Sequence, residues 1–246
     1  MKKHIPNALT CLNLLCGCLA LTSIFTPDPQ NPGLHNLVVG AYFVGLATVA
    51  DFLDGLVARA LRVSSPIGKD LDSLADMVSF GVVPGAILHQ LLTTALASAA
   101  PLAGGLQYLP LAAFIVTIFS ALRLAKFNND TRQTNSFIGL PTPACTLVVA
   151  SLPLILAANA GAPTAIDKLI LNPWALLALT VLLAGLLVAE LPLFALKFKS
   201  FGLVGNRQRY LFLLLAAALT LWLHAAAVPL VVLLYVGLSV VGPRRM

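Results

Sequence analysis

Residues 51–76 read DFLDGLVARALRVSSPIGKDLDSLAD, and this stretch holds five of the nine acidic residues in a chain of 246 residues. All five are aspartates: Asp51, Asp54, Asp70, Asp72 and Asp76. Long apolar runs lie on both sides of the stretch. The clustering of five carboxylates in so apolar a chain needs an explanation, and we look for it in the apolar segments on either side of the stretch.

The composition is that of an integral membrane protein. Hydrophobic residues make up 59% of the chain and charged residues 10%, with a mean hydropathy of +0.94, whereas a soluble domain is about 25% charged. A membrane-spanning helix needs about 20 apolar residues, and eight such stretches are present: 8–26, 36–60, 69–95, 108–127, 140–158, 173–190, 209–224 and 227–241. We therefore predict an all-α polytopic helical bundle with about eight transmembrane helices in a single membrane domain, residues 1–246.

The basic residues predict how this bundle is oriented. Cytoplasmic loops of membrane proteins are enriched in Lys and Arg. With the eight stretches as spans, fourteen of the fifteen Lys and Arg residues fall on one side, and only Lys168 falls on the other. We expect both termini and the aspartate-rich stretch at the cytoplasmic face of a bacterial-type inner (cell) membrane. The net charge of +6 then favours anionic lipid headgroups and gives no reason to expect nucleic acid as a partner.

The first aspartate pair belongs to the second predicted span. Asp51 and Asp54 are three residues apart, so their side chains share one helix face with about 5–6 Å between Cβ atoms. This helix should end near residues 62–64, because Ser65 precedes a proline and is disfavoured in the α region. Ser65 and Pro66 then suit the N-cap and the first position of the next helix.

The second pair lies on that next helix. Asp72 and Asp76 are four residues apart and share a face with Ser79, whereas Asp70 points elsewhere in the first turns, where a carboxylate suits the helix dipole. Two antiparallel helices therefore offer a carboxylate pair each to the groove between them. We predict these four aspartates, without Asp70, as one site.

A divalent metal site is the favoured reason for this grouping. Asp51 lies about 12 Å inside the end of its helix, where an ionised carboxylate is costly without a counter-charge. Mg²⁺ and Mn²⁺ prefer oxygen ligands, and four carboxylates can hold two ions about 3.5–4 Å apart. Salt bridges to loop arginines are a structural alternative. The ion pathway of an ion-coupled transporter is another, but it favours acids near the membrane centre.

The spacing D-x2-D-G-x2-A-R-x8-G-x3-D-x3-D resembles the signature of the CDP-alcohol phosphatidyltransferases at all eight fixed positions. In that family an alcohol hydroxyl attacks the lipid-side phosphorus of a CDP-linked lipid, and CMP leaves. The resemblance implies that the four aspartates bind Mg²⁺ or Mn²⁺ and that Asp76 is the catalytic base. It also implies a CDP-lipid site made by the remaining fixed positions: Gly55, Ala58, Arg59 and Gly68.

Further stretches look like the phosphatidylserine synthase branch of that family: IPNALTCLNLLCG at 5–17, ADMVSFGVVPG at 75–85, ALRLAKFN at 121–128 and FIGLPTPA at 137–144. This resemblance implies CDP-diacylglycerol and L-serine as substrates. Glycerol 3-phosphate and inositol phosphate are alternative acceptors, but their phosphate should need a denser basic pocket than Arg123 and Lys126 provide. The resemblance also implies a homodimer, for which the residues themselves offer no feature.

Residues of the fourth and first spans complete the predicted site. Arg123 lies within an apolar segment, where a cation is costly, and with Lys126 and Asn128 it is a candidate for binding serine's carboxylate or the lipid phosphate. On the first span a polar stripe faces either the site or a neighbouring helix: Asn7, Thr10, Asn13 and Gly17. We place the catalytic core at about 1–158, followed by additional helices at about 159–246 to which the sequence assigns no role.

Overall fold

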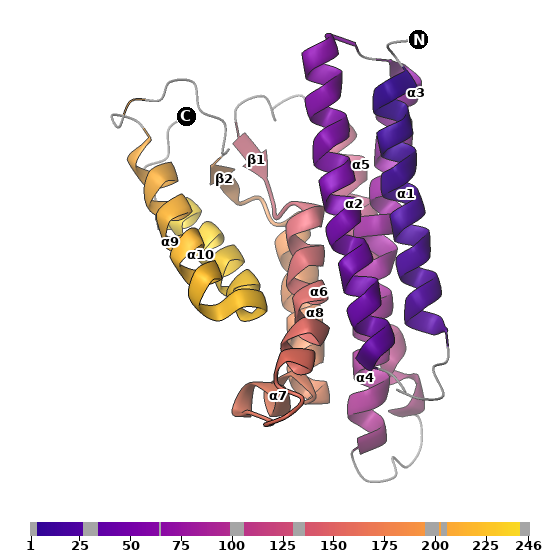
Figure 1. Ribbon diagram of the computed structural model, residues 1–246, viewed down its shortest axis with the longest axis vertical. Helices are drawn as coiled ribbons and strands as arrows, with labels where there is room; N and C mark the ends of the chain where they lie inside the picture. Colours follow the sequence, from indigo (N-terminus) through magenta and orange to yellow (C-terminus); the bar gives the residue numbers. More distant parts are fainter. Residues whose placement is uncertain are drawn as a thin grey trace.

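The computed structural model describes residues 4–26, 34–63, 65–98, 106–129, 136–194, 202 and 206–241. These residues form helices of several kinds and one small sheet (Figure 1). In chain order the elements are α1 (His4–Phe25), α2 (Leu34–Leu61), α3 (Pro66–Asp76), the π-helix η1 (Met77–Val82), α4 (Val83–Ser98), the 3₁₀-helix η2 (Leu106–Phe114), α5 (Ile115–Asn129), β1 (Ser136–Ile138), α6 (Thr142–Ala158), α7 (Ala165–Ile170), α8 (Pro173–Val188), β2 (Pro192–Phe194), α9 (Arg207–Leu223), the 3₁₀-helix η3 (His224–Ala226) and α10 (Ala227–Val241).

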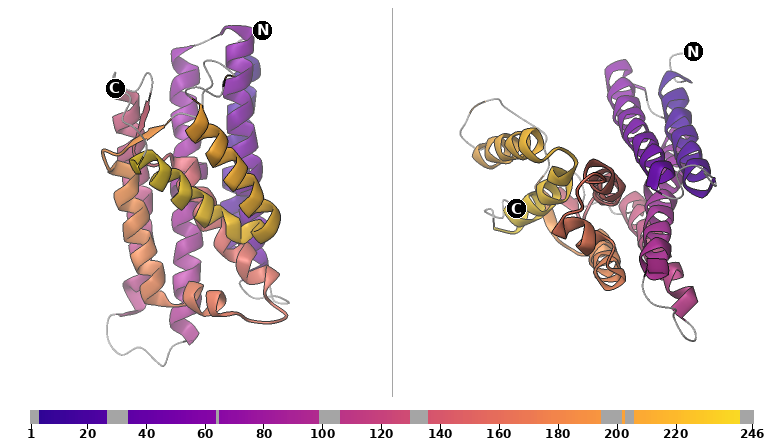
Figure 2. Two further views of the ribbon diagram at one scale, coloured as in Figure 1. Left: turned by 90° about the vertical axis from the view of Figure 1, so that its left-hand side faces the viewer. Right: turned by 60° about the horizontal axis from the view of Figure 1, so that its bottom comes forward.

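The predicted helical bundle is confirmed, and each of the eight apolar stretches falls on helix. Five helical segments of the described chain are long and apolar enough to cross a membrane: His4–Phe25, Leu34–Leu61, Pro66–Ala97, Leu106–Asn129 and Arg207–Val240. The last one folds back at His224 (φ 50°), so α9 and α10 lie side by side (Figures 1 and 2). α6 and α8 are apolar but shorter. The number of crossings therefore stays a prediction.

The orientation of the bundle also stays a prediction. Several of the basic residues on which it depends lie outside the described residues: Lys2, Lys3, Arg132, Lys197, Lys199, Arg244 and Arg245. Among the described elements, α7, which carries Lys168, lies at the opposite end of the molecule from α3 (Figure 1). That separation agrees with the predicted distribution of charge.

One feature of the fold was not predicted, a two-stranded antiparallel sheet made by β1 and β2. Three residues a strand are too few for a periodic pattern to indicate a sheet. The turn after β1 depends on Gly139, whose φ is +78° and whose N–H donates to the Leu191 carbonyl at 3.0 Å. A Cβ at this position would lie 2.6 Å from the Leu187 carbonyl oxygen, so the turn requires glycine.

α4 lies at the centre of the bundle. Its side chains Val83, Ile87, Leu88 and Leu91 are at most 1% exposed, because η2, α6, α1, α8 and α5 pack around it. The first half of α4 is therefore a core helix, whereas Thr93 and Thr94 near its C-terminal end are exposed. α3, which carries two of the aspartates, continues into α4 through η1 and is therefore anchored by the core.

The π-helix η1 interrupts what the sequence predicts as one continuous helix over 69–95. Pro84 has no N–H to donate to the carbonyl four residues earlier, that of Phe80. The Thr146 hydroxyl of α6 donates to the Phe80 carbonyl instead, at 2.9 Å, and the Thr117 hydroxyl of α5 donates to the Gly81 carbonyl at 2.9 Å. Two neighbouring helices thus supply hydrogen bonds to the carbonyl groups of η1, the irregular turn that directly follows Asp76.

The C-terminal hairpin attaches to the bundle through aromatic side chains. Tyr235 of α10 packs against Phe194 of β2 and Phe212 of α9, with ring centroids 5.0 and 5.6 Å away, and its hydroxyl donates to the Phe194 carbonyl at 2.9 Å. α10 also packs against α6. Residues beyond 158 therefore connect through α6 to α2, one of the two helices that carry the aspartates.

Candidate active site

The connection between α2 and α3 has the predicted form. α2 ends at Leu61, and Arg62 takes a left-handed conformation with φ 52°. Ser65 is the N-cap of α3, with its hydroxyl accepting the Gly68 N–H at 3.0 Å, and Pro66 begins the helix. This turn sends α3 back along the bundle, where it packs mainly against α1.

Three of the four predicted aspartates converge. One carboxylate oxygen from each of Asp51, Asp72 and Asp76 lies within 4.8 Å of the others, and all three side chains are partly buried. The carboxyl groups of Asp51 and Asp76 come close enough for a hydrogen bond. α2 and α3 thus bring their acidic side chains together at this point.

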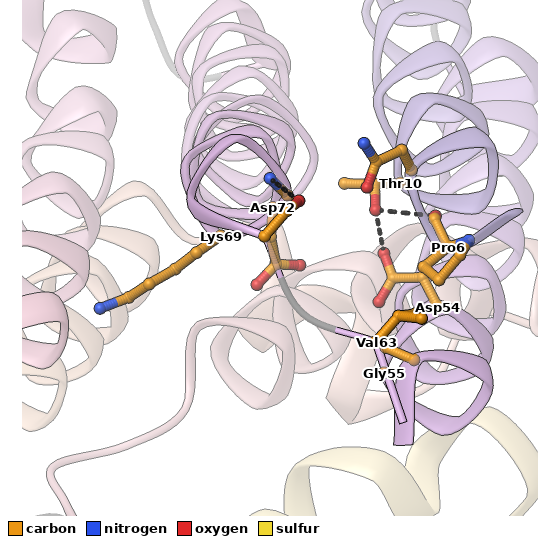
Figure 3. A pocket seen from close by; sticks show the side chains of 11 residues that line it. Pro6, Thr10, Asp54, Gly55, Val63, Lys69 and Asp72 are labelled. Atoms are coloured by element: carbon orange, nitrogen blue, oxygen red, sulfur yellow. Dashed lines mark hydrogen bonds between the residues drawn. The ribbon is translucent and has the colours of Figure 1, made fainter. Parts of the chain in front are cut away.

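Asp54 stands slightly apart from this triad. The residue is 7% exposed, and its carboxylate accepts a hydrogen bond from the Thr10 hydroxyl of α1, with 2.6 Å between Oγ1 and Oδ2. It lines a cavity together with Asp72, which faces it from α3 (Figure 3). The structure therefore brings three aspartates together and places the fourth on the wall of an adjoining cavity.

The donor set fits a hard divalent cation. Three carboxylates within 4.8 Å repel one another strongly when ionised in an apolar setting. Among the described residues, Arg123 is the cation that interacts electrostatically with this group, through Asp76, and one positive charge does not balance three or four negative ones. Oxygen-only ligands of this kind suit Mg²⁺ or Mn²⁺.

The cavity beside the aspartates has a volume of about 260 Å³. It lies among the ends of α1, α2 and α3 and is lined by Pro6, Asn7, Thr10, Asp54, Gly55, Ala58, Val63, Ser65, Gly68, Lys69 and Asp72 (Figure 3). Three of the four positions predicted for the CDP-lipid are therefore at its wall, and all three are small residues. Small side chains let a ligand come close to the helix backbone.

Two basic residues, Arg59 and Lys69, lie near the wall of the cavity. Arg59 is exposed, and its guanidinium lies against Gly55, where an added Cβ would be 3.6 Å from it. The Lys69 side chain leads toward α5 (Figure 3) and donates to the Asn128 carbonyl at 3.4 Å. The Asn128 side chain in turn donates to the Ser73 hydroxyl at 2.8 Å. Lys69 and Asn128 thus connect α3 to α5.

Arg123 and Lys126, the other candidates on α5, differ in their surroundings. Arg123 is 7% exposed, lies over the Phe127 ring at 5.7 Å and has an Nε without a hydrogen-bond partner among the described residues. Lys126 is exposed. A buried guanidinium near Asp76 with an unpartnered Nε is a candidate for pairing with an anion.

The neighbours of Arg123 include residues that the sequence gives no reason to expect there. Tyr235 and Cys145 lie near it. A single tyrosine in an apolar run gives no sequence signal of this kind. Its proximity to Arg123 follows only from the packing of the C-terminal hairpin.

The polar stripe of α1 contacts both the aspartates and a neighbouring helix, so each of its two predicted directions accounts for part of it. Besides the Thr10 contact, the Asn13 side chain donates to Asp76, with 3.3 Å between Nδ2 and Oδ1. The Asn13 backbone carbonyl accepts the Ser79 hydroxyl at 3.0 Å. Gly17 permits that approach, because a Cβ there would lie 2.4 Å from the Ser79 Oγ.

The aspartate geometry and the comparison with known proteins define the class. The chain belongs to the CDP-alcohol phosphatidyltransferase family, whose family model matches residues 3–241. The protein is therefore a transferase of phosphatidyl groups with the membrane-type helices of that family.

Curated relatives have a common name, CDP-diacylglycerol–serine O-phosphatidyltransferase. The protein of that name from Bacillus subtilis (strain 168) is 34% identical over 159 residues, which cover 63% of this chain and 80% of the relative. The Helicobacter pylori (strain J99) protein is 34% identical over 146 residues, covering 58% of this chain and 54% of the relative. The Methanocaldococcus jannaschii protein is 32% identical over 145 residues, covering 59% and 58%. This chain thus spans little more than half the length of the last two.

Proposed function

We propose that this protein transfers the phosphatidyl group of CDP-diacylglycerol to L-serine, giving phosphatidylserine and CMP. The observation that carries the proposal is the triad of Asp51, Asp72 and Asp76 beside a cavity whose wall contains Asp54 and the small residues of the family signature. The names of the relatives support serine as the acceptor.

In the proposed reaction the serine hydroxyl oxygen forms a bond to the lipid-side phosphorus. The bond from that phosphorus to the CMP oxygen breaks, and the hydroxyl proton passes to the Asp76 carboxylate. Asp76 suits this role because it lies at the inner end of the motif, where Asn13 and Asp51 approach it. A positioned carboxylate of this kind contributes by general base catalysis.

The four aspartates would hold divalent metal, Mg²⁺ or Mn²⁺, with two ions as the number that four carboxylates on facing helices can hold. When bound, such ions supply positive charge for the pyrophosphate and for the departing CMP. Gly55, Ala58 and Gly68 leave room for the nucleotide in this proposal, and Arg59 pairs with a phosphate at the open side.

Arg123 is proposed to bind the carboxylate of serine. It is buried, its Nε is unused, and its charge acts on Asp76. A carboxylate held there brings the serine hydroxyl to the same side as the proposed base. Lys126, which is exposed, and Asn128, which contacts Ser73, complete the predicted acceptor region at its edge.

The predicted arrangement in the membrane is part of the same proposal. Eight crossings with both termini in the cytoplasm of a bacterial-type cell place the aspartates at the cytoplasmic face of the inner membrane. The diacyl tails then stay in the bilayer while the headgroup reaches the metals. We keep a homodimer and a single membrane domain with a catalytic core at 1–158 as further proposals.

The acceptor is tested by CMP release from purified protein in liposomes. CDP-diacylglycerol and Mn²⁺ are supplied, and L-serine, glycerol 3-phosphate, inositol phosphate or choline is offered separately. We expect release with L-serine alone, because one buried arginine suits a carboxylate better than a phosphate-bearing acceptor. Release with another alcohol would retain the phosphatidyl transfer and reject serine. Failure with every acceptor, together with ion flux in the same liposomes, would favour a transporter.

Replacing Arg123 by alanine tests the acceptor site. We expect Arg123→Ala to raise the KM for serine at least about tenfold, the effect of losing one charge-assisted hydrogen bond of about 1.5–3 kcal/mol, with a smaller change in the KM for CDP-diacylglycerol. Lys168→Ala, which removes an exposed charge from α7, serves as the matched control and should behave like the wild type. The reverse pattern of KM values would assign Arg123 to the lipid phosphate.

A further inference from the structure

The polar stripe of α1 contacts the metal-site aspartates of both motif helices. The Thr10 hydroxyl donates to Asp54 of α2 at 2.6 Å, and the Asn13 amide donates to Asp76 of α3 at 3.3 Å. Both donors are buried: Thr10 is 3% exposed and Asn13 is 0% exposed. α1 carries no acidic residue of its own, so it meets the carboxylates through hydrogen-bond donors.

The proton of Thr10 has two acceptors within range. Its hydroxyl lies 3.1 Å from the Pro6 carbonyl of its own helix, as is common for threonine in a helix, and 2.6 Å from Oδ2 of Asp54 (Figure 3). A hydroxyl carries a single proton, and a bond to an ionised acceptor is shorter and stronger than one to a neutral carbonyl. The proton therefore belongs mainly to the contact with Asp54.

This contact distinguishes the two oxygens of Asp54. Oδ2 accepts the proton of Thr10, and the backbone of Gly55 also donates to this carboxylate, so both contacts bear on how it is oriented beside the cavity. Without the hydroxyl, the carboxylate would lose its side-chain partner on α1 and keep the Gly55 backbone contact, which would restrain rotation about its last torsion less well than the two contacts together. Asp54 needs such support more than the other aspartates, because it lies outside the triad of carboxylate oxygens.

Both the side chain and the backbone of Asn13 make hydrogen bonds. Its side chain donates to Asp76, and its backbone carbonyl accepts the hydroxyl of Ser79 at 3.0 Å. Ser79 is 0% exposed and lies in η1, directly after Asp76. Two contacts of Asn13, one through its side chain and one through its backbone carbonyl, thus hold α1 against the helical segment that carries Asp76 and Ser79.

We infer that Thr10 and Asn13 are positioning residues, each orienting one motif aspartate, so that α1 determines which carboxylate oxygens face the metal. The inference rests on the proposed use of a divalent cation by the four aspartates. Groups that orient metal ligands from behind typically change metal affinity or activity about 10- to 100-fold when they are removed. α1 thereby becomes part of the metal site without contributing a ligand.

The test measures binding of Mn²⁺ itself to purified full-length protein by electron paramagnetic resonance, without substrate. Thr10→Val keeps the shape of the side chain and removes the donor, so we expect the Mn²⁺ affinity to fall at least about tenfold. Thr10→Ser keeps the hydroxyl and should restore affinity to within about threefold of the wild type. Asn13→Leu, which removes the amide donor at similar size, should also weaken Mn²⁺ binding.

Thr22→Val is the matched control on the same helix. Thr22 is exposed and donates to the carbonyl of Cys18 at 2.9 Å, so its replacement should leave Mn²⁺ binding unchanged. Wild-type affinity in Thr10→Val, or a loss in Thr10→Ser as large as in Thr10→Val, would overturn the positioning role while leaving the metal site intact. A wild-type protein that binds no Mn²⁺ would overturn both the metal proposal and the positioning role.

Discussion

Asp76→Asn is expected to reduce CMP release by at least about 10²- to 10⁴-fold, the usual contribution of a positioned general base. The amide has the size of the carboxylate but does not accept the proton of the acceptor hydroxyl. It also removes one negative charge from the three that converge in the triad. The measurement is CMP release from CDP-diacylglycerol and serine, with the variant matched to the wild type in amount and in its elution as a single species.

Asp70→Asn is the control for this variant. Asp70 lies on the same helix, is exposed, and is not part of the triad, so the change should leave turnover close to that of the wild type. The pair differs only in the position from which a charge is removed. Turnover of Asp76→Asn within a few fold of the wild type would reject Asp76 as the base.

Removing divalent metal with EDTA should abolish CMP release and also lower the midpoint of thermal unfolding. Both effects follow from the convergence of Asp51, Asp72 and Asp76 within 4.8 Å. A ligand that binds only the folded protein stabilises it by about 2.7 kcal/mol at a concentration of about 100 Kd. Added Mn²⁺ or Mg²⁺ should restore both the activity and the midpoint, as measured by CMP release and by calorimetry on the same sample.

A variant with asparagine at all three triad positions provides the control. Its uncharged side chains no longer repel one another, and its unfolding midpoint should be insensitive to both EDTA and Mn²⁺. The wild type and the variant therefore separate specific binding at the triad from a general effect of divalent ions on the membrane. The metal proposal would be contradicted if metal analysis showed that the ions had been removed and the wild type still had full activity.

Much of the site was predictable because it depends on local spacing. The pairing of Asp51 with Asp54 and of Asp72 with Asp76 follows from the helix repeat. The N-cap role of Ser65 follows from the proline after it, and the structure has that cap. The helices themselves were equally predictable, because a run of about 20 apolar residues has the length that a membrane-spanning helix needs.

The parts that the sequence did not predict depend on contacts between distant segments. Nothing in the spacing separates Asp54 from the other three aspartates; the separation arises because α1 supplies Thr10 at that position. Tyr235 lies far from Arg123 along the chain, and the hairpin of α9 and α10 brings the two together. The sheet of β1 and β2 is likewise a pairing of distant three-residue segments.

The π-helix η1 rotates α3 relative to α4 about their shared helix axis. A π-type hydrogen bond spans five residues, as between the Val83 N–H and the Val78 carbonyl, so the segment contains one residue more than an α-helix would use. In an α-helix one residue corresponds to a rotation of about 100°. In genetic terms, a single inserted codon is enough to turn the aspartates toward α1 while Val83–Ser98 keeps its place in the core. Deleting that codon would join α3 and Val83–Ser98 into one regular helix, in which neither segment could rotate without the other.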